Sequence, residues 1–97
     1  MSTRADAGYL YKNITTATTA AVKTGTGKLK SVIVNKPVAS EAITLYDGTS
    51  SGTKIGTITL PGTLLQQGPY GVDFDVQLAA GLTVVKSSTS DITVIYC

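Results

Sequence analysis

The sequence predicts an all-β fold, a single-domain antiparallel β-sandwich or jelly-roll-like barrel of about six to eight short strands. Three observations lead to this prediction. Short runs rich in β-branched residues recur at intervals of roughly 8 to 12 residues, with turn residues between them. Residues 72–78 alternate apolar and polar side chains with a period of two, which is typical of a half-buried strand. No segment combines the 3.6-residue period of a helix with capping residues.

The first part of the chain contains the least regular elements. Residues 1–12 show no clear period, so we expect a flexible N-terminal arm there and a β-sandwich domain over residues 13–97. Residues 13–22, NITTATTAAV, are interpreted as one irregular strand because their β-branched side chains favour strands. The next strand is predicted over 28–35, KLKSVIVN, and ends at Pro37 because proline has no N–H for a ladder.

Five more strands are predicted in the rest of the chain, separated by glycine, proline, or runs of serine and threonine. They span residues 42–46, 54–60, 72–78, 82–85 and 91–96. In the third of these, the apolar residues share the face expected to point into the core and the polar residues share the opposite face. The first set is Val72, Phe74, Val76 and Leu78, and the second is Asp73, Asp75 and Gln77.

Size, composition and charge limit the classes of protein. A chain of 97 residues is one domain, and its charged fraction of 14% is below the usual ~25%, which leaves little charge to oppose association. No window approaches ~18 apolar residues and no signal peptide is visible, so neither a membrane partner nor secretion is expected. Residues 1–36 hold six basic residues and one acidic residue, whereas residues 37–97 hold two and five. A basic first third suits an acidic partner surface, with a solvated lysine-rich face as the alternative.

Catalytic and cofactor chemistry have little support in the residue types. The chain has no histidine, the commonest general base and metal ligand, and its one thiol, Cys97, has no base to activate it and no partner for a disulfide. We therefore expect no enzyme, no cofactor and no metal. Asp73 and Asp75, roughly 7 Å apart on one strand face, are expected to be solvent-facing residues, with a weak cation site or a glycosidase pair as the alternatives.

Neither phosphate binding nor nucleic-acid binding is expected from the sequence. Residues 24–30, TGTGKLK, resemble a phosphate loop but have Val22 and Leu29 where that motif needs Gly and Ser or Thr, so they are interpreted as a turn between strands. The basic residues are few and the aromatic residues form no stacking platform, so no nucleic-acid partner is expected. The predicted contacts with a protein partner lie in the arm, which can become ordered on binding. They are Arg4, Tyr9, Tyr11 and Lys12.

Two long segments of the sequence resemble small virion proteins encoded in the structural-gene clusters of tailed bacteriophages. They are SVIVNKPVASEAITLYDGTSSGTKIGTI at residues 31–58 and YGVDFDVQLAAGLTVVKSSTSDITVIY at residues 70–96, within a resemblance that covers residues 30–97. The resemblance implies a β-structured capsid decoration or cement protein that binds the exterior of the capsid and stabilises it by noncovalent contacts.

The same resemblance implies the partners and the location of the protein. The partners would be the major capsid protein or other virion proteins, together with further copies of the chain in a homo-oligomer, most simply a homotrimer. The protein would be assembled into the virion in the cytoplasm of the host bacterium. A neck, tail or fibre component of the virion is an alternative. A host-attachment or carbohydrate-binding module is another, for which Tyr46, Tyr70 and Tyr96 are the candidate aromatic contacts.

Overall fold

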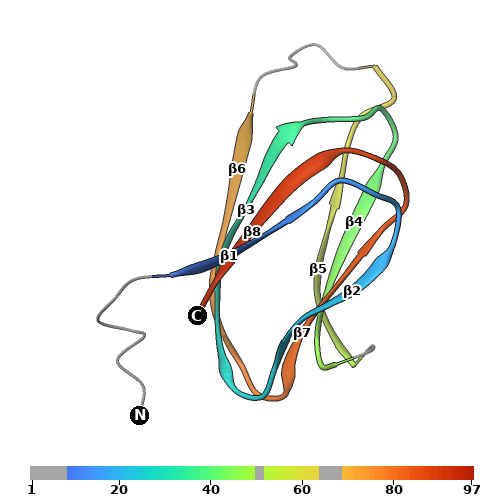
Figure 1. Ribbon diagram of the computed structural model, residues 1–97. Coiled ribbons are helices and arrows are strands. Elements are labelled where there is room, and N and C mark those ends of the chain that lie inside the picture. Colours follow the sequence, from blue (N-terminus) through green and yellow to red (C-terminus); the bar gives the residue numbers. More distant parts are fainter. Residues whose placement is uncertain (1–8, 50–51, 64–68) are drawn as a thin grey trace.

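The computed structural model describes residues 9–49, 52–63 and 69–97, which form eight strands and no helix (Figure 1). The predicted all-β fold is confirmed. The strands are β1 (Leu10–Ile14), β2 (Thr19–Thr24), β3 (Gly27–Lys36), β4 (Ala42–Asp47), β5 (Thr53–Thr59), β6 (Tyr70–Leu78), β7 (Gly81–Lys86) and β8 (Asp91–Tyr96).

The strands form two four-stranded antiparallel sheets that pack face to face. The first sheet has the order β1-β8-β3-β6 and the second has the order β2-β7-β4-β5. Each sheet therefore combines strands from both halves of the chain, which is the interleaved arrangement of an eight-stranded jelly roll. Of the two architectures that the sequence left open, the structure is a double-sheet sandwich with jelly-roll topology.

The last two strands of the chain are inner strands, one in each sheet. β7 lies between β2 and β4 in the second sheet, and β8 lies between β1 and β3 in the first sheet. An apolar strand at a sheet edge would offer a template for aggregation, but both of these strands are paired on both sides. The apolar sequence of β7 follows from its burial along nearly its whole length, and the side chains of Ile92 and Val94 in β8 point into the core.

The segment at residues 13–22 differs from its prediction as one strand. Asn13 and Ile14 end β1 in the first sheet, whereas Thr19 begins β2 in the second sheet, and the chain crosses between the two sheets over residues 15–18. β-branched composition favours strand but carries no signal for the change of sheet. Because β1 begins at Leu10, the predicted boundary between residues 12 and 13 falls inside a strand. The predicted arm over residues 1–8 lies outside the described residues.

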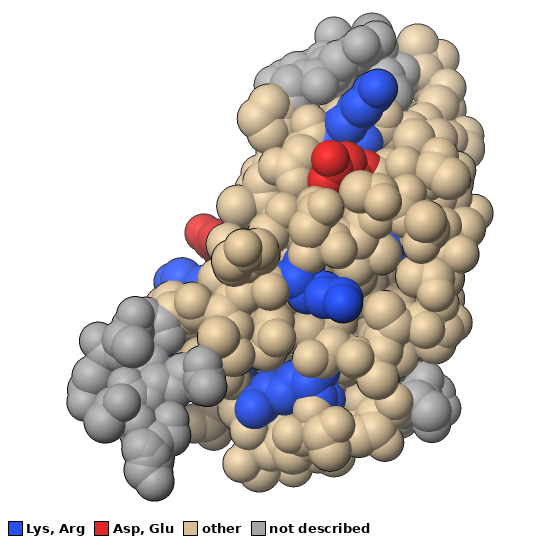
Figure 2. All heavy atoms as spheres, viewed as in Figure 1, with Lys and Arg blue, Asp and Glu red and all other residues tan. Residues whose placement is uncertain are grey.

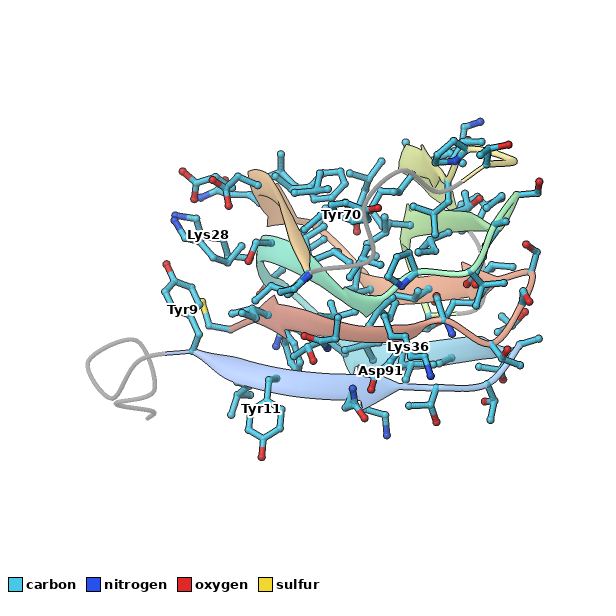
Figure 3. The ribbon with its side chains drawn as sticks, turned by 90° about the horizontal axis from the view of Figure 1, so that it is seen from above. Tyr9, Tyr11, Lys28, Lys36, Tyr70 and Asp91 are labelled. Carbon is cyan, nitrogen blue, oxygen red and sulfur yellow. The ribbon has the colours of Figure 1, made fainter. Side chains whose placement is uncertain are left out.

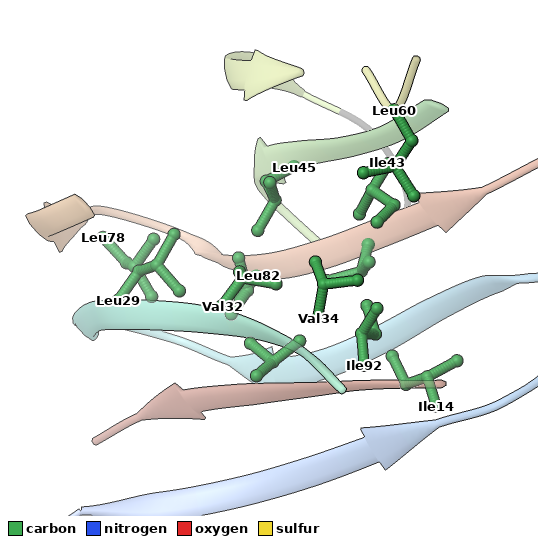
Figure 4. Close-up of a cluster of buried hydrophobic side chains, with 12 residues drawn as sticks. Ile14, Leu29, Val32, Val34, Ile43, Leu45, Leu60, Leu78, Leu82 and Ile92 are labelled. Carbon is green, nitrogen blue, oxygen red and sulfur yellow. The ribbon is translucent and has the colours of Figure 1, made fainter. Parts of the chain in front are cut away.

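The core lies between the sheets and consists of aliphatic side chains from every strand except the edge strands β2 and β5, with Leu60 just after β5 (Figure 4). Its buried members are Ile14, Leu29, Val32, Val34, Ile43, Leu45, Leu60, Leu78, Leu82, Val84, Ile92 and Val94. The predicted alternation in β6 is confirmed, since its apolar residues are the more buried ones. A β-bulge interrupts the pairing of β6 with β3, with Asp75 at a φ of 53°. Beside this bulge, the Phe74 ring approaches Gly56 of the opposite sheet.

Candidate interaction surface

The edge strand β1 carries the most exposed aromatic side chains among the described residues. Tyr9, just before the strand, is 47% exposed and Tyr11 is 74% exposed, and no other large hydrophobic side chain in the described part of the chain is exposed. β1 pairs with β8 on one side only, with Tyr11 opposite Ile95. Figure 3 shows that Tyr11 points away from the body of the molecule. Tyrosine is enriched in protein interfaces because it combines a large apolar ring with a hydroxyl group.

Lys12 occupies an inward-facing position at the rim of the sandwich. It lies between Leu10 and Ile14 in the alternation of β1 and opposite the buried Val94. Its side chain is nevertheless exposed, because β1 is the last strand of its sheet. An inward-pointing charge on an edge strand discourages the addition of a further strand from another molecule. Lys12 therefore protects the edge of β1 against unspecific strand pairing.

Three of the four predicted partner-binding residues, Tyr9, Tyr11 and Lys12, lie on β1 or just before it, and all are exposed. Their side chains point in different directions, with Tyr9 on the side of Lys28 and Tyr11 on the opposite side of the strand (Figure 3). Arg4 lies outside the described residues. We call the side chains of Tyr9, Tyr11 and Lys12 the β1 surface.

A polar network on the outer face of the first sheet holds β1 against its neighbours. The Asn13 side-chain amide donates to Asp91 Oδ1 at 2.6 Å and to the Ile92 carbonyl at 2.8 Å. The Asn35 amide donates to Thr93 Oγ1 at 2.9 Å and, more weakly, to Asp91 Oδ1 at 3.3 Å. These bonds connect β1, β8 and β3, so the β1 surface is presented by an anchored strand. Sequence reasoning did not identify this network, because its members come from three separate segments.

The carboxylate pair on β6 is only partly available for a ligand. Asp75 forms an ion pair with Lys28 at 2.9 Å, and hydrogen bonding to this partner lowers the pKa of Asp75 and raises that of Lys28. Asp73 is exposed on the same strand. No group of three or more histidine, cysteine or acidic side chains close enough to hold a metal ion occurs within the described ranges. Asp73 and Asp75 therefore belong to no such group among the residues that the structure describes.

The turn with the phosphate-loop-like sequence lies at one end of the sandwich. Residues 24–30 form the end of β2, a two-residue turn and the start of β3, as the sequence predicted. Next to this turn is an open pocket of about 630 Å³, lined by Thr26, Gly27, Gln77, Leu78 and Ala79. This lining contains no charged side chain that would select a phosphate group.

Two acidic residues that the sequence left without a role are engaged inside the fold. Asp47 accepts hydrogen bonds from the backbone N–H groups of Ala79, Ala80 and Gly81, at 2.9 Å for the first two and 3.3 Å for the third, and these bonds lower its pKa. Glu41 is buried, accepts from the Ser90 N–H at 3.0 Å and lies 3.7 Å from the Lys86 ammonium group.

The tyrosines predicted as alternative sugar contacts do not form an exposed platform. Tyr46, Tyr70 and Tyr96 are each half-buried, and Tyr70 and Tyr96 pack against the core. A sugar-binding site would require exposed rings that a pyranose can stack on. Within the described residues, the exposed rings are those of the β1 surface.

Comparison with known proteins gives no match from which a role could be inferred. No protein-family model matches the chain, and no curated protein matches it in sequence. In the described ranges, no helix is both long enough and apolar enough to cross a membrane. The molecule is defined as an eight-stranded jelly roll with an aromatic, basic edge.

Proposed function

We propose that this chain is a noncatalytic structural virion protein, a capsid decoration or cement subunit that binds the capsid exterior through the β1 surface. The observation that carries the proposal is the exposure of Tyr9 and Tyr11 beside an edge strand that pairs on one side only. Jelly rolls of this kind serve in viral capsids, although they also occur in lectins and cupins, so the fold permits the role without requiring it. The resemblance of residues 30–97 to small phage virion proteins favours the capsid.

The mechanism of such a subunit is thermodynamic linkage. A subunit that binds the assembled shell, and does not bind its separated parts, stabilises the shell by an amount that grows with its free concentration relative to Kd. Low charge favours this role because few ions must be desolvated in the interface. Figure 2 shows that charged side chains are sparse and scattered over one face of the molecule. Homotrimerisation would add avidity, because three β1 surfaces would bind one shell together.

The first prediction concerns Tyr11 and uses shells of the major capsid protein encoded by the same genome. Purified wild-type protein is expected to sediment with expanded shells and to raise their temperature of disruption. Tyr11→Ser is expected to weaken binding about tenfold or more, because truncation of a central interface tyrosine commonly costs more than 1.4 kcal/mol.

Lys54→Ser provides the matched control, since it removes an exposed side chain from β5 on the other side of the sandwich. It should bind shells like the wild type. If the wild type fails to bind shells but sediments with tails or tail fibres, the protein is a component of those structures. Saturable binding on a glycan array, without binding to shells or tails, would support the host-attachment module.

A further inference from the structure

The four edge strands of the sandwich differ in how they are protected against pairing with a further strand. Inward-pointing charges, β-bulges and charged side chains all oppose such pairing. β1 has the inward-facing Lys12, and β2 has a bulge next to Lys23. β6 has a bulge at Asp75 and an exposed charge at Asp73. β5 has Lys54 near its start, but the rest of the strand carries no charge.

The uncharged part of the β5 edge is regular and is bounded at both ends. A bulge at Ile55 interrupts the pairing of β5 with β4, and residues 56–59 then pair without a break. Pro61 has no N–H for a ladder, so a further strand could pair no further than the residue before it. Ile58 is therefore the middle of the regular stretch 56–60, with a threonine on each side of it.

The side chains of this stretch alternate as they do in a strand inside a sheet. Thr57 and Thr59 are exposed on the outer face, where Thr57 Oγ1 donates to Thr44 Oγ1 at 3.4 Å. Ile58 faces between the sheets, opposite the buried Ile43, and is itself only half-buried. Within the described ranges β5 has a strand neighbour on one side only, so alternate residues direct their backbone N–H and C=O groups to the unpaired side.

A second copy of the chain fits this edge by two-fold symmetry. A half-turn about an axis normal to the sheet at Ile58 places β5 of the two copies side by side and antiparallel, with the same face inward in both. Ile58 then lies opposite Ile58 of the partner subunit, and Thr57 lies opposite the partner's Thr59. Pairs of threonine and of β-branched side chains stabilise antiparallel strands. The same operation at β1 or β6 would bring the like charges of Lys12 or of Asp73 into one interface.

We propose that two copies of this chain associate through β5, with a two-fold axis at Ile58, so that their second sheets join into one continuous sheet. The contact is isologous, because both copies use the same surface, and it closes without adding further copies. The inference goes beyond the proposed function and does not rest on it. β1 lies on the side of the sandwich opposite β5, so both β1 surfaces remain available to a shell (Figure 3). The two-fold dimer takes the place of the homotrimer that the resemblance implies.

The second prediction tests the register of this contact at two exposed positions. T57E/T59K places glutamate opposite lysine twice across the two-fold axis, whereas T57K/T59K places lysine opposite lysine twice. Opposite charges stabilise a cross-strand pair and like charges destabilise it, so the dissociation constant should fall about threefold or more in the first variant and rise about threefold or more in the second. Sedimentation velocity over a wide concentration range measures the mass, which in the wild type should rise from one 10.0 kDa chain toward two.

T19K/A21K is the matched control, since it adds two lysines at exposed positions of β2, the other edge strand of the second sheet. It should keep the dissociation constant of the wild type. A wild type that stays a single chain at all concentrations, or that has the constant mass of a trimer, would overturn the proposal. Equal dissociation constants for T57E/T59K and T57K/T59K would also overturn it, because the two positions would then not face each other across the axis. Shell binding is measured separately, so either hypothesis can fail alone.

Discussion

At the scale of single residues, the main feature of this protein is an ion pair sealed between the sheets. The side chains of Glu41 and Lys86 have no exposed surface. The Lys86 ammonium group donates to the carbonyls of Thr16, Ser88 and Ser90, at 3.2, 3.2 and 2.5 Å. Burial lowers the pKa of Lys86, and the nearby Glu41 carboxylate opposes that shift. The pair therefore joins the β1–β2 connection, β7 and the β7–β8 turn at one polar point.

The third prediction is that Glu41 and Lys86 act as one unit. Glu41→Gln leaves a buried ammonium group without its counter-charge, and Lys86→Met leaves a buried carboxylate, so each should lower the free energy of unfolding by about 3–5 kcal/mol. The double variant E41Q/K86M buries neither charge and keeps an acceptor for the Ser90 N–H, so its loss should be well below the sum of the two. Urea unfolding of all four proteins measures this coupling. Additive losses would show that the two side chains act independently.

The sequence held a signal for this pair that composition alone does not reveal. Within β7, Leu82, Val84 and Lys86 share the inward parity of the strand. Glu41 stands one step before Ile43 and Leu45 in the inward parity of β4. Strict extension of the period of two would therefore place both charges between the sheets. Glutamate and lysine are rarely buried, so the sequence alone suggests that each strand stops short of its charged residue.

At the scale of elements, the β6–β7 turn is shaped by a residue from another strand. Asp47, the last residue of β4, accepts the backbone N–H groups of Ala79, Ala80 and Gly81. Gly81 has a φ of 152°, and a side chain there would meet the Lys23 carbonyl at 2.6 Å. The turn therefore depends on a carboxylate 32 residues earlier in the sequence and on a glycine at its end.

The fourth prediction follows from the lowered pKa of Asp47. A carboxyl group with a lower pKa in the folded protein contributes stability above its unfolded pKa of 3.8, and this stability is lost as the pH falls through the folded value. Asp47→Asn should therefore be less stable than the wild type at pH 7, and the difference should shrink at pH 3 and below. Urea unfolding at the two pH values measures both differences. An equal difference at both would assign the effect to side-chain shape instead of charge.

The elements also show how far the sequence determines the fold. Period-two alternation predicted β6, and the glycine and proline residues between β3, β4 and β5 predicted where these strands end. Both signals are local in the sequence. The change of sheet between Ile14 and Thr19 and the bulge at Asp75 depend on partners distant in the sequence, so no local pattern announces them. Tyr9, Tyr11 and Lys12 were predicted from residue type as contacts of a flexible arm, whereas Tyr11 and Lys12 lie in a paired strand.

At the scale of the whole molecule, the strands at the end of the chain lie inside the sheets, and the strands at its beginning lie at the edges. The last two strands are the inner strands β7 and β8, and the first two, β1 and β2, are edges. Neither sheet can be completed until β7 and β8 are in place, and most contacts join residues far apart in the sequence. Folding of such a topology is expected to be slower than that of a helical domain of equal length.

The fifth prediction is that amide hydrogen exchange is slowest in the inner strands at the end of the chain and fastest in the edge strands. The slowest amides should belong to β7 and β8, which are paired on both sides and line the core, because their exchange requires global unfolding. In a single copy, the outward-facing amides of β1 and β6 should exchange fast, since their sheet ends there. Exchange in β1 and β6 as slow as in β7 and β8 would contradict this prediction.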